Sequence, residues 1–167
     1  KIGLIKLGWQ RIFPVLLKLD SEADTKALGN RLGRNTEKGV YISLEGEMGS
    51  GKTTLARGFL QACGIRENIK SPTYSLVESY QNNGKFFFHF DFYRLQSPTE
   101  FLDAGLQEYF ESPNICIVEW PERMAHLMRT PDITVRLEYS DSHRFGLISY
   151  KTETGYNCLS YAKLIER

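Results

Sequence analysis

A glycine-rich segment over residues 46–53 constrains this chain more than any other feature. It reads G-E-M-G-S-G-K-T and matches G-x-x-x-x-G-K-[ST] at every fixed position. A β-rich run over 39–45 precedes the segment, and a helix-forming run over 53–62, ended by Gly64, follows it. Strand, loop and helix form the context that a phosphate-binding loop requires. The chain is therefore expected to fold as an α/β protein around this loop.

Each residue type in the loop contributes to phosphate binding. Glycines allow positive φ and let the backbone approach closely, so that consecutive N–H groups face the phosphate oxygens. The N-terminus of the following helix adds the positive end of its dipole. Lys52 is expected to reach the β- and γ-phosphates, and the Thr53 hydroxyl to bind Mg²⁺. The predicted ligands are ATP or ADP with Mg²⁺, and the predicted binding residues are Met48, Gly49, Ser50, Gly51, Lys52, Thr53 and Thr54.

A nucleotide hydrolase also needs a carboxylate at the end of a neighbouring buried strand to hold the metal. Glu119 directly follows one apolar run, and Asp91 ends another. A carboxylate at such a place is costly unless a cation pairs with it. We expect Lys52, Asp91 and Glu119 to be catalytic, with Glu119 on the metal and Asp91 positioning the attacking water. The alternatives are a Glu119 that reaches solvent, and an Asp91 that is a simple N-terminal cap or pairs with Arg94.

Three nearby features leave alternatives open. Trp120 follows Glu119 and fits either the core or the nucleotide site, and the pattern alone favours the core. His89 lies between two phenylalanines and is predicted to be structural. The segment S-P-T-Y over 71–74 fits a plain turn or a switch-type loop in which Thr73 senses the γ-phosphate or the metal.

The chain as a whole is predicted to be one three-layer α/β domain, 1–167, whose central sheet mixes parallel strands with antiparallel hairpins. Further strands are predicted over 12–19, 74–80, 85–91, 114–120, 132–139 and 144–150. Asn83-Gly84 predicts a hairpin turn between 74–80 and 85–91. Further helices are predicted from Asp20 or Ser21 through Leu32, over 98–110, and over 158–165.

Net charge and cysteine usage limit the classes of partner and the cellular compartment that the chain is expected to have. The 21 basic and 20 acidic side chains give a formal net charge of +1, which argues against a protein that binds nucleic acid by itself. The three cysteines form no metal-binding spacing, and a reducing compartment is expected. The longest apolar run near the N-terminus has four residues, too short to span a membrane. The sequence therefore predicts a soluble cytoplasmic protein that makes no membrane contact and handles RNA only through a partner.

Four motifs, in this order and spacing, give a more specific match than the phosphate loop alone. They read G-E-M-G-S-G-K-T-T, S-P-T-Y-S-L-V-E, F-H-F-D-F-Y-R-L and I-V-E-W-P-E. The set resembles the bacterial TsaE family, also called YjeE, the small P-loop ATPases of tRNA threonylcarbamoyladenosine synthesis. The match runs from about residue 21 to residue 150, and residues 1–18 are not explained by it.

This resemblance implies a P-loop NTPase fold and a partner. TsaE-like proteins join the TsaB–TsaD heterodimer and hydrolyse ATP to reset that complex. TsaD itself transfers the threonylcarbamoyl group to the adenosine beside the anticodon, so tRNA is reached only indirectly. By motif, Lys52 and Thr53 hold phosphate and Mg²⁺, Glu119 is the second metal carboxylate, Asp91 is important for hydrolysis, and Trp120 lies near the nucleotide.

The same resemblance places the adenine base near the start of the first helix and the last hairpin turn, here around Ser21 and His143. Two departures from the family pattern occur. Residues 47–50 read Glu-Met-Gly-Ser where Asp-Leu-Gly-Ala is more usual, and the loop over 121–130 contains fewer glycines than expected.

Two other function classes stay open. A kinase for a nucleoside or another small metabolite would use Asp91-Phe-Tyr-Arg94 as a substrate element and Arg123 and Arg129 in a lid. Against a kinase, no acceptor-binding acid is clearly placed. A nucleotide-gated binding module would bind ATP with negligible turnover.

Overall fold

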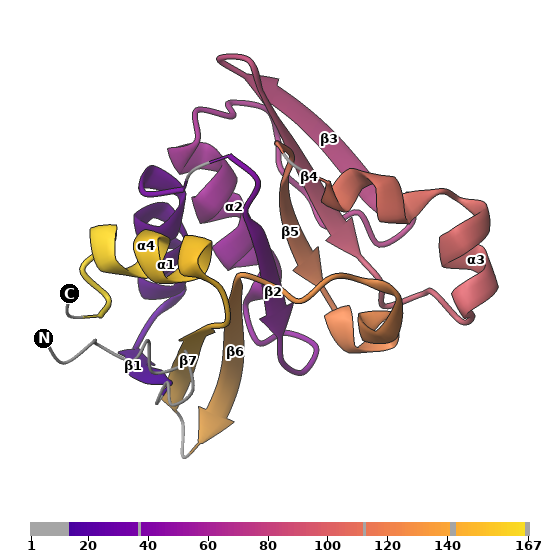
Figure 1. Ribbon diagram of the computed structural model, residues 1–167. Helices are drawn as coiled ribbons and strands as arrows, with labels where there is room; N and C mark the ends of the chain where they lie inside the picture. The colour runs from indigo at the N-terminus through magenta and orange to yellow at the C-terminus, as the bar shows by residue number, and fades with distance from the viewer. Residues whose placement is uncertain (1–13, 37, 112, 141–142, 166–167) are drawn as a thin grey trace, which may run out of the picture.

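The computed structural model describes residues 14–36, 38–111, 113–140 and 143–165, and a mixed β-sheet lies at its centre (Figure 1). The sheet has seven strands in the order β1-β7-β6-β2-β5-β4-β3. β2, β4, β5 and β6 run parallel to one another, and β1, β3 and β7 pair antiparallel with their neighbours. The strands are β1 (Val15–Leu19), β2 (Tyr41–Glu45), β3 (Val77–Asn82), β4 (Lys85–Asp91), β5 (Ile115–Glu119), β6 (Ile133–Ser140) and β7 (His143–Tyr150).

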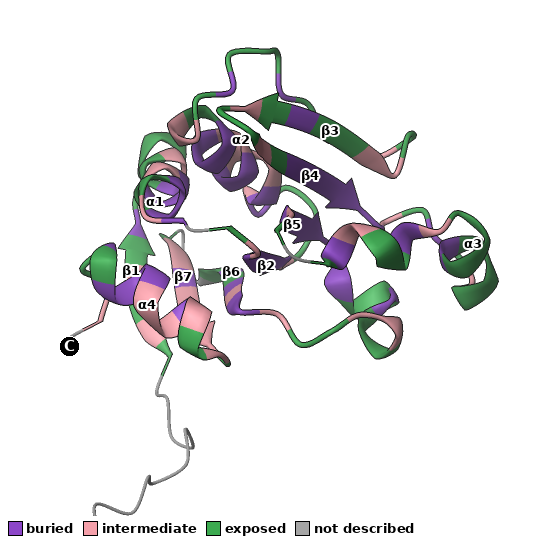
Figure 2. Ribbon diagram, turned by 45° about the horizontal axis from the view of Figure 1, so that its top comes forward, coloured by how far each residue is buried: buried purple, intermediate pink, exposed green. Residues whose placement is uncertain are grey.

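Helices lie against both faces of this sheet, which separates the core into two clusters. α1 (Glu22–Arg34), α2 (Lys52–Ala62) and α4 (Glu153–Tyr161) pack in the first cluster. α3 (Pro98–Asp103) and the 3₁₀ turn η1 (Leu106–Phe110) pack in the second, beside the 3₁₀ turns η2 (Pro121–Arg123) and η3 (Ala125–Leu127). Figure 2 shows α1 buried along one side and exposed along the other, whereas α2 is buried or half-buried over nearly its whole length. The predicted three-layer α/β fold with a mixed sheet is confirmed. None of the described helices is long and apolar enough to cross a membrane.

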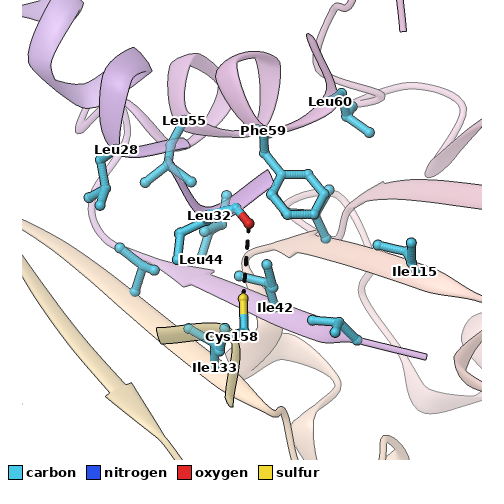
Figure 3. Close-up of a cluster of buried hydrophobic side chains, with 14 of the residues drawn as sticks. Leu28, Leu32, Ile42, Leu44, Leu55, Phe59, Leu60, Ile115, Ile133 and Cys158 are labelled. Carbon is cyan, nitrogen blue, oxygen red and sulfur yellow. Dashed lines mark hydrogen bonds between the residues drawn. The ribbon is translucent and has the colours of Figure 1, made fainter. Parts of the chain in front are cut away.

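Side chains of α1, α2 and β2 interdigitate in the first cluster (Figure 3). Leu28 and Leu32 come from α1, Leu55 and Phe59 from α2, and Ile42 from β2; none of these five is more than 4% exposed. Ser21 begins α1 as its N-cap, because its hydroxyl accepts a hydrogen bond from the N–H three residues later. Of the two residues predicted to start this helix, Asp20 and Ser21, Ser21 is the cap, and it fixes where α1 starts to cover the sheet.

Two glycines let α1 and α2 approach closely. A Cβ at Gly29 of α1 would lie 2.1 Å from the carbonyl oxygen of Leu55. A Cβ at Gly58 of α2 would lie 2.2 Å from the carbonyl oxygen of Lys26. Each glycine therefore faces the backbone of the other helix, and α2, which begins at the phosphate loop, is held firmly against α1.

Alternation along β4 and β5 decides which side chains face α2. Phe87 belongs to the first cluster, whereas Phe88 and Phe90 belong to the second. Because successive strand residues point to opposite faces, His89 and Asp91 share the face of Phe87. On β5 the same rule places Glu119 on that face, since Ile115 and Ile117 belong to the first cluster.

The strand predicted over 74–80 starts later than expected. β3 begins at Val77, because Leu76 adopts a φ of 66° and its N–H donates to the carbonyl oxygen of Pro72 at 2.8 Å. The segment 71–76 is therefore a turn that leads into the strand. The strand predicted over 12–19 is described from residue 14 onward, and residues 12–13 lie outside the described residues.

Two predicted helices also have different bounds. The helix predicted over 98–110 ends at Asp103 and is followed by η1, because Gly105 between them has a φ of 64°. The helix predicted over 158–165 begins at Glu153 instead. Its N-cap is Thr152, whose hydroxyl accepts from the N–H of Gly155.

Candidate active site

The phosphate loop connects the carboxyl end of β2 to the N-terminus of α2, as predicted. Gly46 has a φ of 139°, and a Cβ there would lie 2.4 Å from the carbonyl oxygen of Leu137. Gly51 is the N-cap of α2 with a φ of 105°, in the left-handed region that favours glycine. Helix α2 then starts at Lys52. The first N–H groups of α2 have no acceptor within the helix, so this end favours an anion.

Lys52 is buried, and its ammonium group lies within the loop. Nζ donates to the carbonyl oxygens of Gly46 at 2.6 Å and Glu47 at 2.8 Å. It also lies 4.2 Å from the centre of the Trp120 ring. Burial lowers the pKa of Lys52, and nearby carboxylates, Glu119 first among them, oppose this shift. A phosphate group would give Nζ a charged acceptor and a stronger hydrogen bond than these carbonyls.

Thr53 and Glu119 meet at the start of α2, although they are far apart in the sequence. Thr53 Oγ1 lies 3.0 Å from both carboxylate oxygens of Glu119. Parallel pairing of β2 with β5 sets Glu119 beside Leu44, at the sheet edge where the loop begins. The structure therefore brings together the two residues that were expected to share a metal ion.

Asp91 lies beside Glu119 on the neighbouring strand. β4 and β5 pair these two residues in register, and both carboxylates are buried. Oδ2 of Asp91 accepts hydrogen bonds from the hydroxyls of Ser71 and Thr73, the latter at 3.2 Å, and Oδ1 accepts from the N–H of Tyr93 at 2.9 Å. Asp91 thus fixes the segment 71–74 at the edge of the site while also capping the turn after β4.

Arg94 does not form the ion pair with Asp91 that the sequence suggested; the described residues show no such pair. Its guanidinium carbon lies 4.1 Å from the centre of the Tyr74 ring, and Tyr74 is 84% exposed. Arg94 still lines the cavity described below, so it accompanies Lys52 as a second cation there.

Trp120 adopts a left-handed backbone conformation directly after β5. Its φ is 57°, which is unusual for a bulky residue and costs about 1–3 kcal/mol. Its ring contacts Tyr93 at 5.0 Å between centres and covers the ammonium group of Lys52. The ring also packs partly against the second core cluster. Trp120 therefore belongs to both the core and the site.

A cavity of about 460 Å³ collects these side chains at the carboxyl ends of the parallel strands. Its walls are formed by Met48, Gly49, Gly51, Lys52, Thr53, Thr54, Ser71, Thr73, Asp91, Tyr93, Arg94, Glu119 and Trp120. Most residues of the predicted site are among them. Ser50 is not, because its side chain is buried beneath the loop, where its Oγ has no hydrogen-bond partner among the described residues.

Ser21 and His143 also lie outside this cavity. Ser21 caps α1, and His143 starts β7 with its Nδ1 3.6 Å from a carboxylate oxygen of Asp20. The hairpin of β6 and β7 contacts the phosphate loop, since the Tyr139 hydroxyl donates to the carbonyl oxygen of Gly49 at 3.1 Å. The two residues are thus grouped next to each other near the loop, and their contact with a base stays a prediction.

The donors around Thr53 suit a hard divalent cation. A hydroxyl and two buried carboxylates, Glu119 and Asp91, offer only oxygen, the ligand atom that Mg²⁺ prefers. In nucleotide sites Mg²⁺ is commonly held by one or two carboxylates together with phosphate oxygens. Within the described ranges, no group of three His, Cys, Asp or Glu side chains is arranged as a metal site. The site therefore fits a cation that binds together with a phosphate.

His89 and Ser71 have contacts at the site that the sequence did not predict. His89 is buried, as expected of a structural residue, but its Nε2 lies 2.8 Å from Oε1 of Glu119. Alternation along β4 could indicate that His89 faces away from Phe88 and Phe90, which flank it in the sequence, but it does not identify Glu119 as its partner. Ser71 donates to Asp91, which depends on a turn that the sequence left undecided.

Comparison with known proteins found a family model and relatives that match most of this chain. The family model "Threonylcarbamoyl adenosine biosynthesis protein TsaE" matches residues 19–145. A relative from Haemophilus influenzae is 43% identical over 126 residues, which cover 75% of this chain and 80% of the relative. A relative from Bacillus subtilis is 33% identical over 123 residues, which cover 74% of this chain and 69% of the relative. Both are named tRNA threonylcarbamoyladenosine biosynthesis protein TsaE.

A solved structure shows the same fold. The crystal structure of YdiB from Bacillus subtilis superposes with a TM-score of 0.75 and 21% sequence identity, and the match covers 92% of this chain and 97% of YdiB. The family model matches most of the chain, and it includes the phosphate loop, Asp91, Glu119 and Trp120. This chain belongs to the TsaE family.

Proposed function

We propose that this chain is a Mg²⁺-dependent ATPase that serves the threonylcarbamoyladenosine modification of tRNA. The observation that carries the proposal is the cavity in which the phosphate loop meets Asp91 from β4 and Glu119 and Trp120 from the end of β5. The names of the relatives support the pathway, because they refer to tRNA threonylcarbamoyladenosine biosynthesis.

The side chains of the cavity divide the work in this proposal. The N–H groups of the loop and Lys52 bind the β- and γ-phosphates of ATP. Thr53 and Glu119 would hold Mg²⁺, which would supply positive charge beside the phosphate oxygens. Asp91 orients the attacking water, and the ring of Trp120 keeps Lys52 away from bulk water. The hydroxyls of Ser71 and Thr73 fix the orientation of Asp91.

The proposed partner is the TsaB–TsaD heterodimer, and the proposed compartment is the cytoplasm. In this scheme ATP hydrolysis resets the heterodimer, and tRNA is modified by the partner. The formal net charge of +1 supports an indirect role, since proteins that bind RNA by themselves usually carry a basic excess.

The test is ATP turnover by the purified chain, alone and with a TsaB–TsaD heterodimer, without a phosphate acceptor. We expect turnover that the heterodimer stimulates and that Lys52→Met abolishes, because methionine is an unbranched side chain only one atom shorter than lysine and carries no charge. Arg34→Ala, on the exposed end of α1, is the matched control and should behave as the unchanged protein.

Two outcomes would contradict the proposal. ATP consumption that requires an added nucleoside or metabolite would favour a kinase. ATP binding without turnover in either condition would favour a nucleotide-gated binding module.

A further inference from the structure

His89 is a polar side chain in the middle of an apolar strand. It is 0% exposed and lies on the face of β4 that also carries Phe87 and Asp91. Phe87 packs in the first core cluster, so an imidazole two residues later interrupts a continuous apolar surface. A buried polar ring without a partner costs several kcal/mol in an apolar environment. The hydrogen-bond partner of the His89 ring therefore indicates the role of this residue.

That contact is with Glu119. Nε2 of His89 lies 2.8 Å from Oε1 of Glu119, and Thr53 Oγ1 lies 3.0 Å from both carboxylate oxygens. Thr53 approaches from the first turn of α2, whereas His89 approaches from β4, the strand that pairs with β5. The carboxylate is thus held by two donors on separate elements.

The other ring nitrogen identifies the donor. Nδ1 of His89 is buried and has no hydrogen-bond partner among the described residues. A proton on Nδ1 would leave an N–H group without an acceptor, whereas a proton on Nε2 has Glu119 as its acceptor. The contacts therefore place a hydrogen on Nε2, which donates to Oε1 of Glu119.

We propose that His89 is a positioning residue that orients the Glu119 carboxylate for a divalent cation bound with the nucleotide. The proposal rests on the function proposed above, and it adds His89 as the residue that supports the Glu119 carboxylate. Loss of such a supporting hydrogen bond typically lowers metal affinity by about 10- to 100-fold. Without His89, Glu119 would keep its contact with Thr53 but could rotate about that contact.

Two substitutions separate positioning from simple filling of the core. In His89→Gln the amide nitrogen takes the place of Nε2 and can still donate to Glu119. In His89→Asn the amide nitrogen takes the place of Nδ1, which leaves Glu119 without this donor. Both variants carry a neutral amide, so a purely structural role predicts similar effects for the two.

The measurement is the Mg²⁺ concentration that gives half-maximal ADP binding, followed by Trp120 fluorescence in a Trp9→Phe background. We expect His89→Asn to raise this concentration at least about tenfold, and His89→Gln to stay within about threefold of the unchanged chain. The effect of His89→Asn should vanish in a Glu119→Gln background, because the proposed contact acts through Glu119. Equal Mg²⁺ requirements for both amide variants, or an undiminished effect in the Glu119→Gln background, would overturn the proposal.

A measurement on the unsubstituted chain tests the proposal even if the variants do not fold. Nitrogen NMR of ¹⁵N-histidine-labelled protein should show His89 as the tautomer protonated at Nε2, and a signal from the Nδ1–H tautomer would overturn the proposal. Neither measurement requires turnover. Failure of the ATPase proposal would therefore show as absent hydrolysis, whereas failure of this inference would show in the Mg²⁺ dependence or the tautomer.

Discussion

Replacing Gly29 with alanine should push α1 away from α2 and destabilise the protein. The added Cβ would lie 2.1 Å from the carbonyl oxygen of Leu55 and 2.9 Å from the N–H nitrogen of Phe59. Real Cβ atoms essentially never approach closer than 3.0 Å. The backbones must therefore separate by at least 0.9 Å, the difference between 3.0 and 2.1 Å. Backbone atoms cannot rotate out of the way as the end of a long side chain can.

Two opposing terms set the size of this effect. Overpacking of a close-packed core costs about 1–3 kcal/mol, and a clash against backbone belongs near the upper end. Alanine in place of glycine within a helix returns up to about 1 kcal/mol. The expected net loss in the free energy of unfolding is about 2 kcal/mol, which corresponds to a fall in Tm of roughly 4–8 °C for a chain of this size.

The assay is thermal and urea unfolding followed by circular dichroism, with Arg34→Ala as the control on the exposed side of the same helix. The control should change Tm by little. Gly29→Ala should also weaken ADP binding, because α2 carries Lys52 and Thr53 and must shift with the clash. A Tm for Gly29→Ala equal to or above that of the unchanged chain would refute the packing argument.

Four further predictions concern two residues of the site, Asp91 and Trp120, and two buried residues, Asp132 and Cys116. Asp91→Asn should preserve ATP binding and lower turnover roughly 10²-fold, and unchanged turnover would reject its role with water. Saturation with ADP and Mg²⁺ should change the fluorescence of Trp120 once Trp9, outside the described residues, is replaced by Phe; no change would contradict its place at the site. The buried carboxylate of Asp132 accepts hydrogen bonds from a backbone N–H, a threonine hydroxyl and an arginine guanidinium. Asp132→Ala should therefore lower the free energy of unfolding in urea by about 3 kcal/mol, and a loss near zero would contradict this. Burial raises the pKa of Cys116 to about 12, so little of the reactive thiolate is present at pH 8. Iodoacetamide should then modify Cys116 roughly 10³-fold more slowly than a free thiol, and rapid modification in the folded protein would contradict this.

Local signals predicted much of the fold. The glycine pattern placed the loop between β2 and α2, Asn83-Gly84 placed the turn between β3 and β4, and Ser21 marked the start of α1. Each of these features depends on residues that are adjacent in the sequence. Two of the boundaries that were wrong, the start of β3 and the end of α3, depend on single backbone angles. At Leu76 a positive φ ends the turn before β3, and leucine carries no preference for that conformation that a sequence reader could use.

The site was predictable where it depends on strand ends. Asp91 and Glu119 both end parallel strands, and such ends lie at one edge of a sheet. To predict the contact of His89 with Glu119, a reader would also need to know that β4 lies beside β5 and that both residues face α2. Strand order is set by pairing between distant segments, so the sequence could not supply it. The role of Ser71 likewise depends on how the turn before β3 folds back to Asp91.

Trp120 shows why a residue that fits the core can stand at the site. Glu119 faces α2, so a continued strand would turn the next side chain wholly into the second core cluster. A φ of 57° ends the strand instead and brings the ring over the ammonium group of Lys52 while part of it stays packed against that cluster. Glycine would adopt this backbone angle without strain but would leave Lys52 uncovered. Trp120 therefore combines a strained backbone with a cover over Lys52, at the point where β5 ends with Glu119.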